Sequence, residues 1–101
     1  MTDDKHAGEE IAYTTTWQVE ILLGEVDGRT HGSARLRSPA TRHLVGVGVA
    51  HLNPRDPDVP EIGFELATAR ALSRLGHQLL EVAADDIADV THSRVNTIDL
   101  A

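Results

Sequence analysis

The chain has 101 residues, a formal net charge of −7 and a composition that is 41% hydrophobic, with one Trp, one Tyr and one Phe. This length suits one domain with one core, and the scarcity of aromatic residues means that the core must be aliphatic. The lack of cysteine excludes disulfides and thiolate metal sites, and no apolar run is long enough to span a bilayer, so we expect a cytoplasmic protein with no membrane partner.

Residues 13–25 form the first predicted element. Apolar side chains recur there at every second position from Trp17 to Leu23, which predicts a strand with one buried face. Asp27 and Gly28 then predict a tight hairpin turn, because this pair tolerates the positive φ angles that such a turn requires.

Two further strands are predicted after this turn. In Arg29–Arg37, basic and polar side chains alternate with small or apolar ones, which predicts a strand with one solvated, basic face. Residues 43–52 alternate three valines with Gly46, Gly48 and an alanine. We expect the valines to face the core and the glycines to form a nearly bare surface beside the arginines. The three strands form a predicted antiparallel meander.

The period of the sequence becomes helical after a proline-rich loop over residues 53–60. Asp58 fits a helix cap and Pro60 fits the first turn. Apolar side chains of the predicted helix cover about 200° of its circumference, whereas a helix on one sheet needs only about 100°. Residues 84–92 predict a second, short helix capped by Asp85.

These elements predict an α+β fold of the order β-β-β-α-α. We expect a disordered N-terminal segment over residues 1–12, a single domain over residues 13–92 and a flexible tail over residues 93–101. The wide apolar arc of the helix and the unpaired edges of a three-stranded sheet favour a homodimer.

Positive charge is concentrated in one part of the chain. Residues 28–51 contain four arginines and three histidines but no acidic residue, so they carry +4 and leave −11 for the rest of the −7 total. A net negative charge argues against a general nucleic-acid binder, and we expect no DNA partner. The local basic segment can nevertheless contact phosphate groups.

Motifs for phosphate binding and catalysis are missing from the sequence. Gly46 and Gly48 lack the third glycine of a dinucleotide site, and the proline-rich loop separates them from the predicted helix. No Ser-His-acid arrangement, cysteine or carboxylate pair stands out, so we predict a non-enzymatic protein without catalytic residues or cofactor. His77 and Glu81 lie one helical turn apart, but the spacing offers no third ligand, so we expect an ion pair and no metal site.

The basic face of the second predicted strand is the candidate binding surface. We assign nucleic-acid binding to six residues of this strand and the turn that follows it: Arg29, His31, Arg35, Arg37, Arg42 and His43. A flat cationic surface suits a sugar-phosphate backbone, and the lack of interleaved aromatic residues favours duplex or structured RNA over single strands. The alternative is a solvated strand face whose charges pair with Glu20 and Glu25 of the neighbouring strand.

Residues 44–76, "LVGVGVAHLNPRDPDVPEIGFELATARALSRLG", together with "RLR" before them, resemble a small actinobacterial family of unknown function with a double-stranded-RNA-binding-domain-like fold. The resemblance extends from Trp17 to His92, and its most specific parts are "AHLNP", "VPEIG" and "ARALSRLG". Some members of that family are associated with stress or dormancy, and their fold is similar to that of ribosome hibernation-promoting factors. The resemblance implies a cytoplasmic dimer that binds the ribosome when growth stops, and Arg35 and Arg37 map onto it.

Two functional predictions therefore compete. The first is a non-enzymatic, stress- or dormancy-associated homodimer that binds the ribosome or structured RNA through the basic strand face. The second is a dimeric protein-interaction or regulatory module without nucleic-acid binding, for which the wide apolar arc of the helix is the working surface.

Overall fold

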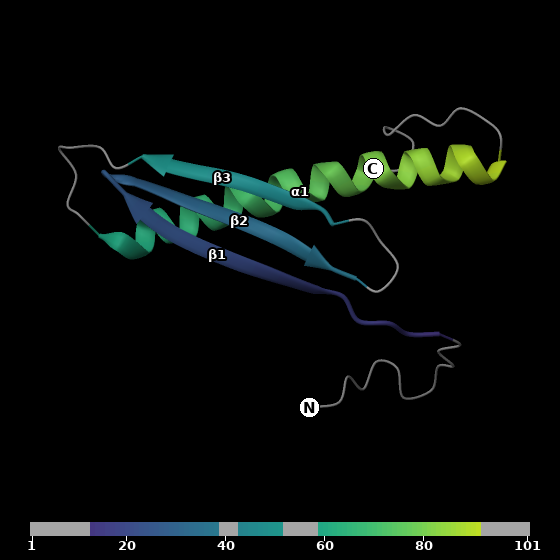
Figure 1. Ribbon diagram of the computed structural model, residues 1–101, viewed down its shortest axis with the longest axis horizontal. Helices are drawn as coiled ribbons and strands as arrows, with labels where there is room; N and C mark the ends of the chain where they lie inside the picture. The colour runs from purple at the N-terminus through teal and green to yellow at the C-terminus, as the bar shows by residue number, and fades with distance from the viewer. Residues whose placement is uncertain (1–12, 39–42, 52–58, 92–101) are drawn as a thin grey trace.

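The computed structural model describes residues 13–38, 43–51 and 59–91. Its elements are, in chain order, β1 (Gln18–Val26), β2 (Arg29–Arg37), β3 (Val45–His51) and α1 (Pro60–Thr91). The strands form one antiparallel sheet in the order β1-β2-β3, and α1 lies across one face of that sheet (Figure 1). The predicted α+β fold, with a meander before a helix, is confirmed. The segments predicted to be a disordered N-terminus and a flexible tail lie outside the described residues.

The two-residue turn between β1 and β2 is the one that the sequence predicts. Asp27 and Gly28 have φ angles of 53° and 74°, and a tight hairpin with the twist of its strands needs such left-handed values at both positions. Val26 pairs with Arg29 directly across the turn. This pairing sets the register of the hairpin, so the basic residues of β2 share a face with the even-numbered residues of β1.

The helix α1 is continuous over 32 residues. Pro60 occupies its first position, where the missing N–H costs no hydrogen bond. Residues 84–91 continue α1, so the separate short helix predicted for residues 84–92 is not confirmed. The sequence favours Asp85 as a cap, yet no glycine or proline after Gly76 interrupts the helical hydrogen bonds. At about 1.5 Å per residue α1 is longer than any strand, and its C-terminal part extends past the sheet (Figure 1).

The face of the sheet under α1 carries the small side chains of β2 and β3. Ala34 and Ala50 are fully or almost fully buried there, and Gly46 and Gly48 share this face. The prediction that the valines of β3 face the core is wrong, because Val47 is 47% exposed on the opposite face. The core is aliphatic, as predicted. Its main cluster consists of Ala34, Leu36, Ala71 and Leu75, with Ile21, Leu44 and Leu79 packed against them.

Close approach of α1 to β3 explains why the glycine face is the covered one. A Cβ atom added at Gly46 would lie 2.5 Å from the Leu75 backbone nitrogen, and one added at Gly48 would lie 2.5 Å from the Ala71 nitrogen. The helix supplies small residues of its own at every fourth position: Gly63, Ala67 and Ala71. Four helical residues rise about 6 Å and two strand residues about 6.6 Å. Because these repeats are nearly equal, successive small residues of α1 lie opposite successive small residues of β3.

Polar side chains of α1 also reach the free edge of β3. The hydrogen bonds run from Arg70 Nη1 to the Val49 carbonyl (2.7 Å), from Arg74 Nη1 to the Val47 carbonyl (2.6 Å) and from Gln78 Nε2 to the Val45 carbonyl (2.9 Å). The donors recur at every fourth residue of α1 and the acceptors at every second residue of β3. These are the same two repeats that place the small residues of α1 and β3 opposite each other. Unpaired carbonyls on an edge strand can recruit a strand of another chain. The contacts from α1 therefore close the β3 edge against strand addition.

Removal of both arginine contacts should weaken this edge. We expect Arg70→Ala with Arg74→Ala to lower the free energy of unfolding by about 1–2 kcal/mol, since a hydrogen bond contributes about 0.5–1.5 kcal/mol net. The freed carbonyls should also speed aggregation on heating. Thermal unfolding with simultaneous light scattering measures both effects. Ser73→Ala, at an exposed position of the same helix, is the control, and equal behaviour of the two variants would contradict the closed-edge interpretation.

Candidate nucleic-acid interface

The face of the sheet opposite α1, which we call the open face, carries the predicted basic row. β2 contributes Arg29, His31, Ser33, Arg35 and Arg37 to this face. The alternate residues of β2 are buried under the helix, so the predicted division of this strand into two faces is confirmed. Because β2 is the central strand, the basic row runs along the middle of the open face.

A cavity of about 300 Å³ lies at the end of this row. It is lined by Arg35, Leu36, Arg37, Ser38 and His43. Three of the predicted site residues thus come together, although His43 belongs to the segment before β3. The Leu36 N–H donates a hydrogen bond of 2.9 Å to the Leu44 carbonyl, which holds His43 beside the end of β2. Guanidinium groups present several donors in a fixed plane and suit phosphate oxygens.

Two of the other predicted site residues, Arg29 and His31, do not line this cavity. Arg29 and His31 lie near the hairpin turn at the far end of β2, and Arg29 is about 20 Å along the strand from Arg35 at 3.3 Å per residue. Arg42 lies outside the described residues. Sequence reasoning missed Ser38, because the segment around it indicates only the break after a strand. The site is therefore a row that ends in a cavity.

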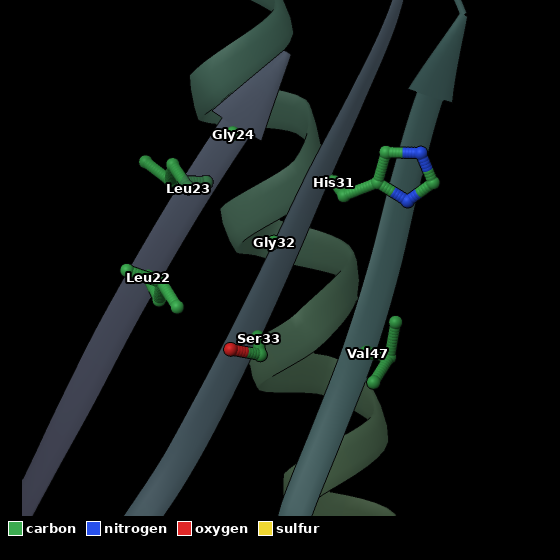
Figure 2. A pocket seen from close by; sticks show the side chains of 7 residues that line it. All are labelled: Leu22, Leu23, Gly24, His31, Gly32, Ser33 and Val47. Carbon is green, nitrogen blue, oxygen red and sulfur yellow. The ribbon is translucent and has the colours of Figure 1, made fainter. Parts of the chain in front are cut away.

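Apolar side chains flank the basic row on both sides. β3 adds its three valines to the open face and β1 adds Leu22. A hollow of about 380 Å³ on this face has a lining that includes Leu22, Ser33 and Val47. Figure 2 shows these side chains on the sheet, with α1 behind it. The predicted nearly bare cationic surface is thus a cationic row between two apolar strips. Small residues recur at every second position of β3 and at every fourth position of α1. This sequence signal could have predicted that the glycine face of β3 packs under α1 and that its valines lie on the open face.

Acidic residues balance the basic row only in part. Glu20 pairs with Arg35 and shares the open face, but Glu25 pairs with Thr30 and therefore lies on the helix side of the sheet. The alternative of a charge-balanced face predicts two carboxylates, whereas the described strands place one, Glu20, on the open face. With three arginines and one glutamate, the described part of this face carries +2. α1 has six acidic and two basic residues, so the positive potential of the described chain lies on the open face.

Other ionisable groups show no further site in the described part of the chain. His77 Nε2 lies 3.4 Å from Glu81 Oε2, and both side chains are exposed. Within residues 13–38, 43–51 and 59–91 no three His, Cys, Asp or Glu side chains come together as metal ligands. No helix among these residues has both the length and the apolar character needed to cross a membrane.

Three antiparallel strands under one long helix, with a basic row along the uncovered face, define a small α+β protein with an open-faced sheet. Among proteins of this class, the chain belongs to the Rv2632c-like family, whose sequence profile matches residues 15–96. The predicted membership of a family of unknown function is confirmed to that extent.

Relatives of the chain are mycobacterial proteins. The uncharacterized protein Mb1767 of Mycobacterium bovis is 54% identical over 76 residues, which are 75% of this chain and 80% of that protein. The uncharacterized protein Rv2632c of Mycobacterium tuberculosis is 47% identical over 95 residues, which are 94% of this chain and 95% of the relative. The crystal structure of Rv2632c superposes with a TM-score of 0.73 at 46% identity and covers 85% of this chain and 99% of its own.

Proposed function

We propose that the chain is a non-enzymatic homodimeric protein that binds structured RNA, above all the ribosome, through the open face of its sheet during stress or dormancy. The observation that supports this proposal is the row of three exposed arginines in the middle of that face, opposed by a single carboxylate among the described residues. Phosphate contacts of this kind supply most of the affinity of proteins for nucleic acid.

The shape of the open face favours duplex RNA as the ligand. An RNA helix presents phosphates and 2′-hydroxyls across a wide, shallow minor groove, and proteins recognise it by shape more than by sequence. The Arg35 and Arg37 cavity offers guanidinium donors for phosphate, and the apolar strips beside the row offer surface to sugars. The order of three antiparallel strands and a helix supports the dsRBD-like fold that the family resemblance implies. The same resemblance implies a likeness to hibernation factors, and this implied likeness is the reason for proposing stress or dormancy as the physiological setting.

Cosedimentation with purified ribosomes over a salt series tests the proposal. If one protomer of the dimer contacts the RNA, its three phosphate contacts predict that the logarithm of the binding constant falls with the logarithm of salt concentration with a slope of about −2 to −3. A matched DNA duplex of the same sequence as an RNA duplex should bind more weakly, because it lacks the 2′-hydroxyls. No retention on ribosomes or on RNA, or retention that salt does not weaken, would reject RNA binding through this face.

A second candidate function, a protein-interaction module without RNA, has an observation of its own. The valines of β3 are partly exposed, and Ile62 and Leu72 of α1 are 53% and 44% exposed. Exposed apolar area marks protein-binding surfaces, and these residues offer two such areas, one on the open face and one on α1. Binding to a partner that salt leaves unchanged, with no RNA retention, favours this candidate.

A further inference from the structure

We infer that the homodimer forms by antiparallel pairing of β1 with β1 of a second copy, centred on Leu22, so that one six-stranded sheet carries both arginine rows on one face. This inference specifies the assembly within the proposed function and has a measurement of its own. Three observations carry it: the difference between the two sheet edges, the direction of the β1 backbone groups and the register that self-pairing allows.

Side chains of α1 form hydrogen bonds with one edge of the sheet and not, among the described residues, with the other. Along β3, side chains of Arg70, Arg74 and Gln78 occupy three outward carbonyls. Among the described residues, no hydrogen bond from another element reaches the outer edge of β1. β1 is nine residues long and contains no proline, so it lacks a common means of protecting an edge. Strand addition is therefore directed to β1.

The β1 groups that point outward follow from the hydrogen bonds of the other edge. The carbonyls of Val45, Val47 and Val49 accept from α1, so they point away from β2. In an antiparallel ladder, the β2 residues opposite them then bond to β1 instead. Their partners in β1 are Glu20, Leu22 and Gly24. The outward N–H and C=O groups of β1 consequently belong to the alternate residues, Val19, Ile21, Leu23 and Glu25.

Apolar side chains of β1 are left uncovered, because α1 packs mainly on β2 and β3. Leu22 is 72% exposed and Val26 61% exposed on the open face, and Val19 is exposed on the other. The flank of α1 that points away from Arg70 and Arg74 carries another hollow of about 400 Å³. Its lining is Phe64, Glu65, Thr68, Ala69 and Leu72. A partner strand along β1 would cover the edge and approach this flank.

The sequence of β1 is complementary to itself in one register. Only pairing centred on Leu22 opposes all nine residues of β1 with the nine of a second copy. In that register Glu20 faces Gly24 of the partner subunit, and Glu25 faces Val19 of the partner subunit, so no carboxylate opposes another. The outward backbone groups of the two β1 strands exchange about eight hydrogen bonds. The two Leu22 residues form a non-hydrogen-bonded pair, the type of pair in which facing side chains lie closest.

This assembly changes what the open face can bind. An axis perpendicular to the sheet keeps both open faces on the same side, so the two β2 rows run antiparallel about 14 Å apart, three strand spacings of about 4.8 Å. Six arginines then face one ligand, and the salt slope of RNA binding should steepen to about −4 to −5. A monomeric variant should show about half that slope.

The test uses the absence of cysteine from the chain. Leu22→Cys introduces a single thiol into each protomer. In the inferred register the two thiols of the dimer lie near disulfide distance, since paired Cβ atoms are about 4.5–5.5 Å apart. Oxidised glutathione should convert this variant to a covalent dimer about tenfold faster than Val47→Cys, because the closed β3 edge keeps two Val47 positions apart. Both sites are exposed on the same face, and non-reducing electrophoresis over time gives both rates.

A second pair of variants tests the same interface without thiol oxidation. Leu22→Lys opposes two ammonium groups at the centre of the interface and should raise the dimer dissociation constant at least about tenfold, while Val47→Lys leaves it unchanged. Equal cross-linking of the two cysteine variants, or sedimentation of the unmodified protein as a monomer at micromolar concentration, would overturn the inference. Cross-linking at Leu22 without RNA retention upholds the β1 pairing and rejects the RNA proposal. RNA retention without preferential cross-linking rejects the pairing alone.

Discussion

Replacement of Gly46 or Gly48 by alanine should lower the free energy of unfolding by about 3 kcal/mol, at the upper end of the usual cost of overpacking. The added Cβ at either site would overlap backbone atoms of α1, at Ala71 and Leu75 or at Ala67 and Ala71. Backbone cannot rotate aside as a side chain does, so the whole helix must lift from the sheet. At about 4–8 °C per kcal/mol for a domain of this size, each variant should melt at least 10 °C lower.

Thermal and urea unfolding of the two single variants and the double variant measure this effect. The double variant should be largely unfolded at 37 °C, because a domain has only about 5–15 kcal/mol of stability to lose. Gly76→Ala is the matched control: a Cβ there has no neighbour within 4 Å, and alanine stabilises a helix by about 0.5–1 kcal/mol relative to glycine. A melting temperature unchanged by Gly46→Ala would show that α1 does not pack this closely.

Neutralisation of Arg35 and Arg37 should lower affinity for ribosomes and duplex RNA at least tenfold. Removal of one arginine–phosphate interaction weakens binding about fivefold near 0.15 M salt and makes the salt slope shallower by about 1. The double variant Arg35→Gln, Arg37→Gln removes both guanidinium groups from the cavity at the end of β2. Both side chains are exposed, so the melting temperature should change little. Filter binding and cosedimentation over a salt series give the affinity and the slope together.

A control with the same change in net charge separates local contacts from overall repulsion. Ser73→Glu with Ala83→Glu also adds two units of negative charge, at exposed positions of α1. We expect this variant to bind less than about threefold more weakly, because charges beyond a Debye length of about 8 Å are largely screened. An equal decrease in affinity for the two variants would show that overall charge, and not the open face, governs binding.

Elements whose signal is local were predictable from the sequence. An Asp-Gly pair between two runs of alternating side chains favours a two-residue hairpin turn, and Asp27 and Gly28 form that turn. The alternation of β2 put basic side chains on one face and small ones on the other, and only the small ones can be buried without a charge penalty. The start of α1 at Pro60 follows from proline's fixed φ and missing N–H.

The faces of β3 were not predictable in the same way. Alternation divides Val45–His51 into a valine face and a glycine–alanine face, and burial of valine, at about 1.5–3 kcal/mol per side chain, favours the valine face as the core. The structure buries the other face, because α1 approaches so closely that only glycine and alanine fit beneath it. A preference inferred from one strand was outweighed by the close approach of α1, whose contacting residues Ala67 and Ala71 follow Gly48 by 19 and 23 residues.

The sequence by itself determined the order of strands and helix, the hairpin turn, the aliphatic core and the basic row of β2, because each depends on periodicity or on backbone preferences within a few residues. Only the tertiary structure decided that the glycines of β3 lie under α1, that Arg70 and Arg74 close one sheet edge, and that Arg35, Arg37 and His43 meet at one cavity. The first two features depend on how closely α1 packs on the sheet, and that distance is set by small residues on both elements acting together. The third depends on the hydrogen bond from the Leu36 N–H to the Leu44 carbonyl, which brings the segment before β3 to the end of β2.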